Sequence, residues 1–207
     1  MGGKMMKKGG WLIVSLAVVL AGCSGPHRVV DPNWRTPPSS FTVVTTEPFT
    51  SNEGDVLDDF GGLEGFRQWF AAYLDSSLSI SSPLPHSVRV VEDRSIAMEP
   101  MYVGNVLVKE PLLANASRDS LSGVVLIVHP VHFRREMPSC SGGTCIGDKR
   151  LYLQVAYSVV SVEDHKILVH GLANGSVSFH FAMTRSDWEK VVQQVSWRLV
   201  DGTPLKN

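Results

Sequence analysis

Hydrophobic and polar positions alternate most regularly in the second half of the chain, where they predict two long β-strands. Residues 151–159 carry leucine, valine or tyrosine at every second position, and residues 167–181 resume the alternation after an acidic turn. Strict alternation is typical of strands with one buried face, so the two segments predict a long hairpin. Small residues interrupt the apolar face of the second strand and indicate a bulge or close helix packing there: Gly171, Ala173 and Gly175.

Three shorter apolar runs, at 41–46, 87–91 and 123–133, predict further strands. The run 123–133 is apolar at most positions, so we expect both of its faces to be covered at least in part. Pro130 within this run cannot donate a backbone hydrogen bond, which predicts a bulge or an unpaired edge.

Apolar residues at spacings of three and four predict two amphipathic helices. The first spans about 63–78. The second follows a capping box formed by Ser186 and Glu189 and ends near Gly202. We expect its apolar stripe to pack on the sheet because a lone amphipathic helix is stable only when its stripe is covered. That stripe consists of Trp188, Val191, Val192, Val195 and Leu199.

Residues 92–119 fit no single period. Within or beside this segment, 101–108 is consistent with an added strand and 112–120 with a short helix. The elements together predict an α+β fold in the order β-α-β-(α)-β-β-β-α. We expect a single mixed or antiparallel sheet of four to five strands, with two to three helices packed on one face.

The N-terminal region has the pattern of an export signal. An apolar run at 11–20 follows three lysines and is too short to cross a membrane, which takes about 20 residues. It leads into Leu20-Ala21-Gly22-Cys23, which resembles the lipobox of bacterial lipoproteins. The resemblance implies cleavage between Gly22 and Cys23 and attachment of acyl chains such as palmitate to Cys23. The serine at position 24, in place of aspartate, implies the outer membrane and a periplasm-facing protein.

These features predict three regions. Residues 1–22 are a signal peptide, 23–40 hold the lipidated cysteine and a proline-rich flexible tether, and 41–207 form a periplasmic domain. Cleavage removes three lysines and changes the formal charge from −1 to −4. The mature chain has no basic stripe, so we expect no nucleic-acid partner. The expected membrane contact is through the acyl chains on Cys23, because several chains give stable anchoring.

Two cysteines remain, Cys140 and Cys145, separated by Ser-Gly-Gly-Thr. We expect a disulfide between them because the periplasm is oxidising. A redox pair is the alternative, although the two-residue spacing typical of such pairs is missing. A metal site there would need two further ligands, and none stands at a recognisable spacing.

No set of residues predicts catalysis. The chain has no Gly-x-Ser-x-Gly elbow and no glycine-rich phosphate loop after a strand. His129 and His132 are expected to point to opposite faces of a strand and to be partly exposed, which argues against a metal site. We therefore expect no catalytic residues, metal, cofactor or small-molecule substrate. The acidic residues Asp55, Asp58, Asp59 and Glu64 lack the ligand spacing of a calcium loop, so we interpret them as a solvated acidic loop. Three further histidines are interpreted as isolated structural or surface groups: His165, His170 and His180.

The residues from 123 to 181 resemble the ABC-type transport auxiliary lipoprotein family. The likeness consists of an apolar strand ending at Phe133, a variable loop and an alternating hairpin with an acidic turn. Residues 43–49 are similar to the first strand of the amino-terminal domain of the Tol-Pal periplasmic propeller protein, and the overall order also resembles the curli-secretion lipoprotein. These families imply a non-enzymatic envelope lipoprotein, an accessory or regulatory component of a transport or assembly complex with a periplasmic or outer-membrane protein partner. The alternative is an oligomeric structural or secretion-related lipoprotein.

Overall fold

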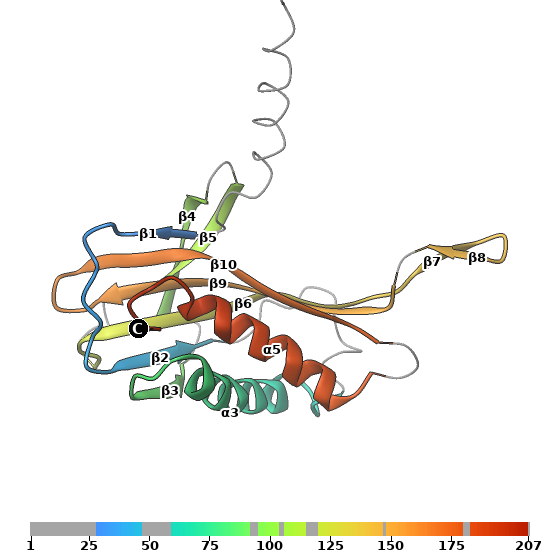
Figure 1. Cartoon of the computed structure of the whole chain (residues 1–207), viewed down its shortest axis with the longest axis horizontal. Coiled ribbons are helices and arrows are strands. Elements are labelled where there is room, and N and C mark those ends of the chain that lie inside the picture. The colour runs from blue at the N-terminus through green and yellow to red at the C-terminus, as the bar shows by residue number, and fades with distance from the viewer. Residues whose placement is uncertain are drawn as a thin grey trace, which may run out of the picture.

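A computed structural model describes residues 28–46, 59–91, 95–103, 106–114, 120–146, 148–179 and 183–206. Its centre is a six-stranded sheet (Figure 1). In spatial order the strands are β1 (Arg28–Val30), β10 (Lys166–Ser178), β9 (Arg150–Ser161), β6 (Val124–Glu136), β2 (Phe41–Thr45) and β3 (His86–Val90).

The sheet is mixed because its two halves are connected differently. The predicted hairpin of β9 and β10 is present, and β6 and β1 pair antiparallel with its two outer edges. By contrast, β2 runs parallel to both β3 and β6. The segment between β2 and β3 contains helix α3 (Leu63–Ser81), which provides the crossover that parallel neighbours need.

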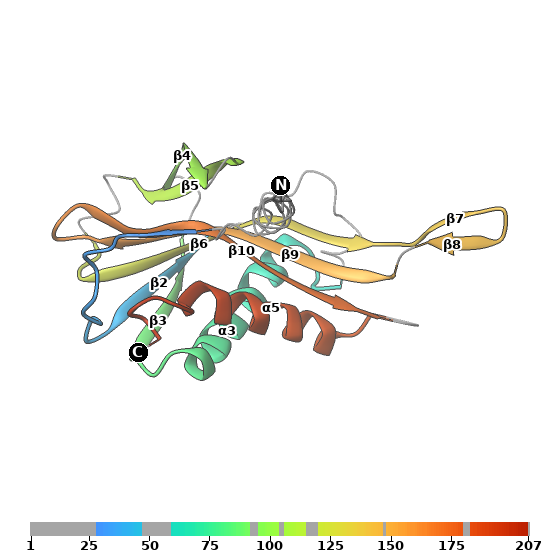
Figure 2. The ribbon, with the colours of Figure 1, turned by 45° about the horizontal axis from the view of Figure 1, so that its top comes forward.

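Two helices cover one face of the sheet, α3 and α5 (Arg185–Val200) (Figure 2). Their apolar stripes meet the inward-facing residues of β2, β6, β9 and β10 in one core. Aromatic rings fill one end of it, where Phe133 of β6 stacks on Trp188 of α5 with centroids 4.3 Å apart. The predicted packing stripe of α5 is fully buried: Trp188, Val191, Val192, Val195 and Leu199.

The opposite face carries a hairpin of β4 (Ile96–Val103) and β5 (Val106–Leu113) (Figure 2). Leu113 packs there in a second, smaller core with Val44, Val125 and Ile127. A third pair, β7 (Ser139–Ser141) and β8 (Thr144–Ile146), forms an arm that extends from the ends of β6 and β9 (Figure 1).

The predicted fold class is wrong, because the chain has more strands and more sheets than expected. The main sheet has six strands rather than four to five, and two further two-stranded sheets accompany it. One extra strand, β1, arises in the segment expected to be a tether, and another two come from residues 96–113. Leu112 and Leu113, expected in a short helix, belong to β5. The described residues contain only α3 and α5 as α-helices, so the optional third helix is not found among them.

Two local predictions have different outcomes. The register of β6 against β9 shifts between Pro130 and His132, which confirms the predicted bulge. The predicted capping box of Ser186 and Glu189 is wrong, because α5 begins one residue earlier than Ser186. Its cap is Thr184, whose backbone N–H and hydroxyl donate to the Asp187 carboxylate at 3.0 and 2.7 Å.

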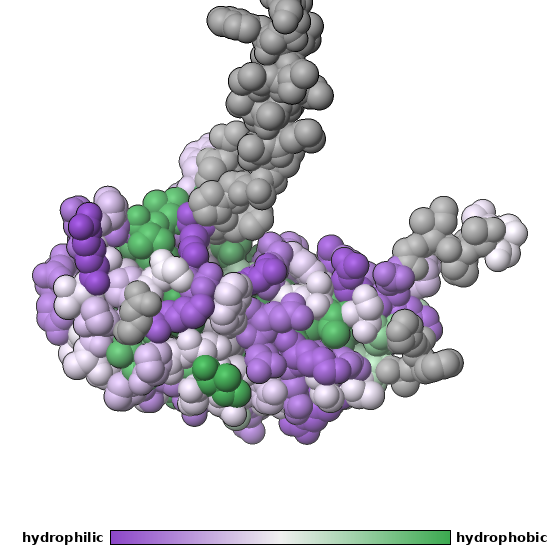
Figure 3. Space-filling model, in the orientation of Figure 1, coloured by the Kyte–Doolittle hydropathy of each residue, from purple (hydrophilic) through white to green (hydrophobic). Residues whose placement is uncertain are grey.

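The surface seen in the view of Figure 3 is mostly hydrophilic, with one group of hydrophobic side chains beside β4 and β5 and smaller hydrophobic patches elsewhere, one of them over α3. Among the described residues, no helix combines the length and the apolar composition needed to cross a membrane.

Candidate functional site

The predicted cleavage and acylation residues, Gly22 and Cys23, lie outside the described part of the chain, as do Asp55, Asp58 and His180. Acylation of Cys23 therefore stays a prediction. The structure instead shows how the chain that follows Cys23 joins the folded domain.

This connection is made by β1, which charged groups hold at both ends. The guanidinium of Arg28 donates to the carbonyl oxygens of Arg198 and Asp201 and lies 3.9 Å from the Asp201 carboxylate. Just after the strand, Asp31 forms an ion pair with Lys166, and this partner lowers the pKa of the Asp31 carboxyl. The polypeptide is thus fixed to the sheet and to α5 only five positions after Cys23.

The predicted disulfide residues lie on paired strands. Cys140 of β7 stands directly opposite Cys145 of β8, and the turn between them has positive φ at Gly142 and Gly143, 58° and 81°. A two-residue turn of this kind makes the flanking Ser141–Thr144 pair hydrogen-bonded and the next pair outward a non-hydrogen-bonded one. Such pairs have Cα atoms about 4.5 Å apart, inside the range that a disulfide spans. The backbone register therefore permits the bond, which stays a prediction.

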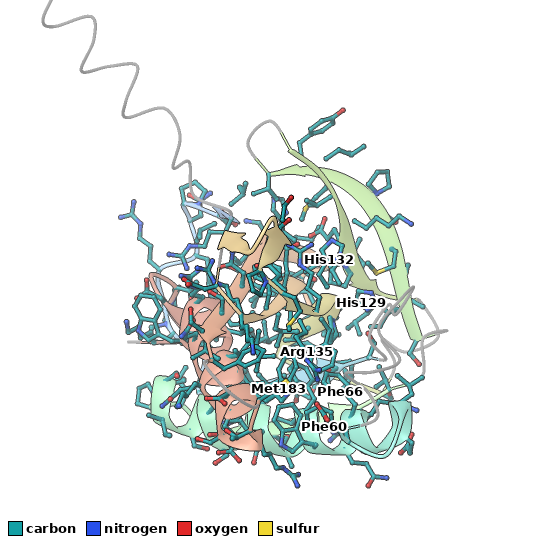
Figure 4. The ribbon with its side chains drawn as sticks, turned by 90° about the vertical axis from the view of Figure 1, so that its right-hand side faces the viewer. Phe60, Phe66, His129, His132, Arg135 and Met183 are labelled. Carbon is teal, nitrogen blue, oxygen red and sulfur yellow. The ribbon has the colours of Figure 1, made fainter. Side chains whose placement is uncertain are left out.

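The expectation that His129 and His132 point to opposite faces is wrong. The bulge after Pro130 inserts one residue, so His129 pairs with Ala156 and His132 with Gln154. Positions 154 and 156 share a face, and both histidines therefore lie on the side that carries β4 and β5, whereas Phe60 and Phe66 lie on the helix side (Figure 4). His129 is also buried, with its Nδ1 2.5 Å from the Thr46 hydroxyl, whereas partial exposure was expected.

The other predicted polar residues are not brought together. His165 occupies the β9–β10 turn with φ of 52°, Asp59 pairs with Arg135 at 3.4 Å, and Glu64 bonds within α3 to Arg67 and Gln68. In the described ranges, no group of three or more histidine, cysteine or acidic side chains is arranged to hold a metal ion.

His170 has a structural contact instead. Its Nδ1 lies 3.3 Å from Oε1 of Glu110, a carboxylate buried between the hairpin and β10. On the next strand, the Ser158 hydroxyl donates to the carbonyl of Pro111. The Ser158 hydrogen bond connects β5 to β9, and Glu110 of β5 faces His170 of β10, so these polar residues of otherwise apolar strands lie where β5 crosses the sheet.

The half of the sheet nearer the arm presents polar side chains on the same side as the hairpin. We call this the arm-side face and define it by His132, Arg134, Tyr152 and Gln154. Their positions alternate with Phe133 and Leu153, which point into the helix-side core. The Arg134 guanidinium lies 5.0 Å from the centroid of the Tyr152 ring, so the two side chains hold each other in place.

Beyond Arg134, the arm-side face continues into an open hollow at the base of the arm. It is lined by Arg134, Glu136, Met137, Asp148 and Arg150. Arg134 pairs with Glu136 at 2.7 Å, and Met137 is largely exposed. Arginine and tyrosine contribute strongly to binding energy at protein interfaces. The arm-side face thus contains two residue types that are enriched at protein interfaces.

No protein-family model and no curated protein matches the sequence. Several solved structures are similar to the chain, and three of them serve as examples. The hypothetical protein CT253 from Chlamydia trachomatis is 9% identical, with a TM-score of 0.45, and the match covers 80% of this chain and 94% of that one. The PelC dodecamer from Paraburkholderia phytofirmans is 13% identical, with a TM-score of 0.38 and coverages of 87% and 97%. Lipoprotein GNA1162 from Neisseria meningitidis is 12% identical, with a TM-score of 0.32 and coverages of 71% and 88%.

These identities and TM-scores are too low to establish a family or a function. None of the three names refers to a Tol-Pal component or to an ABC-transport auxiliary protein. The family resemblances drawn from the sequence therefore stay hypotheses.

Proposed function

We propose that this chain is a bacterial envelope lipoprotein, held in the outer membrane by acyl chains on Cys23, that acts as a non-enzymatic accessory subunit of a transport or assembly complex. The periplasmic domain binds a protein partner through the arm-side face.

The observation that carries this proposal is the short distance along the chain between the lipobox cysteine and β1. Cys23 precedes Arg28 by five positions, and Arg28 is fixed to the carbonyls at the end of α5. Five residues span at most about 18 Å. Acylation would therefore hold the folded domain close to the bilayer rather than on a long tether.

The arm-side face supports the binding role. Arg134 is exposed and Tyr152 beside it is partly exposed, and their mutual contact preorganises both side chains. A partner that covers them would desolvate an arginine and an aromatic ring without first having to order them, which lowers the entropic cost of association.

Anchoring is tested by metabolic labelling with a radioactive or alkyne fatty acid. The wild-type chain should take up label and sediment with membranes, whereas the Cys23→Ala variant should do neither. Label retained by Cys23→Ala would contradict acylation at this residue.

Partner binding is tested by chemical crosslinking in membranes, followed by purification of the chain and mass spectrometry. An Arg134→Glu, Tyr152→Ala double variant should lose the principal crosslinked partner, and Gln193→Ala, at an exposed position on α5, should retain it. Equal recovery from both variants would exclude the arm-side face as the binding surface. A product composed only of copies of this chain would favour the oligomeric alternative.

A further inference from the structure

Three large apolar side chains are exposed at the edge of the sheet that β1 and the turn end of the hairpin share. Val29 of β1 is 46% exposed, Tyr102 of β4 is 67% exposed, and Leu107 of β5 is 59% exposed. Tyr102 and Leu107 are direct cross-strand partners at the turn end of the hairpin. We call these three residues the edge cluster.

Because β5 crosses the sheet, the Tyr102–Leu107 pair of the hairpin reaches the same edge of the sheet as Val29 of β1. Leu113 packs over β6 and β2, Pro111 accepts a hydrogen bond from β9, and Glu110 contacts His170 on β10. Continuing in that direction, β5 reaches Leu107 beyond β10, on the side where β1 lies. His170 itself pairs with Val29, so the turn end of the hairpin and β1 share this edge (Figure 1).

The predicted acylation site, Cys23, lies only a few positions before the strand that forms this edge. Val29 follows Cys23 by six positions, so a fully extended chain separates their Cα atoms by no more than about 22 Å. An acylated Cys23 lies at the membrane surface, and the bilayer must therefore pass within that distance of β1. No comparable constraint applies to the arm, which extends from the other ends of β6 and β9.

We propose that the edge cluster rests in the interfacial layer of the membrane that holds Cys23, and so fixes the orientation of the domain on the bilayer. This inference rests on the acylation given under the proposed function. Tyrosine suits the interface because its ring is apolar and its hydroxyl remains hydrated, and the valine and leucine side chains leave water on contact. The contact is too small to recruit the protein by itself, but the anchor already supplies the encounter.

The chemistry of a lipid surface fits this cluster better than that of a protein partner. Three side chains along one edge offer a small contact area, whereas stable protein interfaces bury about 800 Å² on each partner. A bilayer interface accepts a small contact area, and the anchor places a bilayer within reach.

The test uses the mature, acylated protein reconstituted in vesicles of phosphatidylethanolamine and phosphatidylglycerol. A photoreactive benzophenone amino acid replaces Leu107 in one variant and Gln193, exposed on α5, in the matched control. After irradiation, mass spectrometry counts phospholipid adducts at each position. We expect adducts at position 107 to exceed those at 193 several-fold. Equal yields, or none at position 107, would overturn the proposal.

The intact mass of the same preparation distinguishes the two possible failures. If the acyl mass is missing, both the proposed anchoring and the edge contact are refuted. If the acyl mass is present and position 107 yields no lipid adduct, only the edge contact is refuted. A repeat in living cells identifies the occupant, since a protein adduct at position 107 would show that the edge is a protein interface and would overturn the lipid assignment.

Discussion

Gly175→Ala should destabilise the protein although it adds only one methyl group. Gly175 lies in β10 where α5 crosses, and a Cβ built on it would lie 2.4 Å from the Val191 carbonyl oxygen and 3.3 Å from Gln194 Cβ. The first of these atoms belongs to the helix backbone, so no side-chain rotation relieves the contact. Either α5 or β10 must move.

The magnitude follows from two opposing effects. Replacing glycine by alanine in a strand ordinarily stabilises by about 0.5–1 kcal/mol because the unfolded chain loses freedom. Overpacking a rigid core ordinarily costs about 1–3 kcal/mol. Because the contact is with backbone, the overpacking cost at this site should lie toward the upper end of that range. The net loss in the free energy of unfolding should therefore be about 1–2 kcal/mol. For a domain of this size, that lowers the melting temperature by roughly 2–8 °C.

The assay is thermal unfolding of the signal-less protein, followed by far-UV circular dichroism. Ser176→Ala is the matched control, because it changes the adjacent residue, which is partly exposed, and leaves the backbone hydrogen bond from Ser176 to Gln194 in place. The control should remain within about 0.5 kcal/mol of wild type. An unchanged or higher melting temperature for Gly175→Ala would refute the close approach of α5 to β10.

Three further outcomes are expected. Non-reducing mass spectrometry of exported protein should show Cys140 bonded to Cys145; two free thiols would exclude the bond. Val195→Asp should make the protein insoluble or greatly lower its melting point, since it buries a carboxylate at a fully buried site in α5, and a wild-type melting curve would contradict this. Hydrogen bonds from Thr184 lower the pKa of Asp187, so its stabilisation should be present above about pH 4 and lost as the pH falls through that lowered pKa. Melting of Asp187→Asn should therefore differ from wild type near neutral pH and converge with it in acid.

The elements that could be predicted are those with one dominant period. The β9–β10 hairpin alternates strictly, and α3 and α5 have continuous apolar stripes, so local pattern and tertiary burial agree. Residues 96–113 were ambiguous for a physical reason. The β4–β5 hairpin lies across a sheet that covers only part of it, so the exposed Tyr102 and the buried Glu110 both contradict simple alternation.

Pairing between distant segments was the main obstacle elsewhere. β1 has only three residues and exists because β10 offers an edge and α5 offers carbonyls to Arg28, neither of which is visible locally. For the two histidines, Pro130 predicts the bulge, and the one inserted residue turns His132 to the same face as His129, which the spacing of three positions alone does not indicate. The arm-side face could not be predicted, because it depends on the register of Arg134 with Tyr152.

The short length of β1 also has a consequence for aggregation. β1 pairs with β10 only at positions 169–171, and among the described residues no strand pairs with β10 from 172 to 178 on that side. Open edges of this kind recruit strands from other chains. Here α5 occupies the edge, since Gln194 accepts the Ser176 N–H at 3.1 Å and Arg198 donates to Asn174. Because α5 follows every described strand in the sequence, a chain whose synthesis stops before Gln194 has an unprotected edge, and resistance to edge-to-edge aggregation is acquired only when that helix docks.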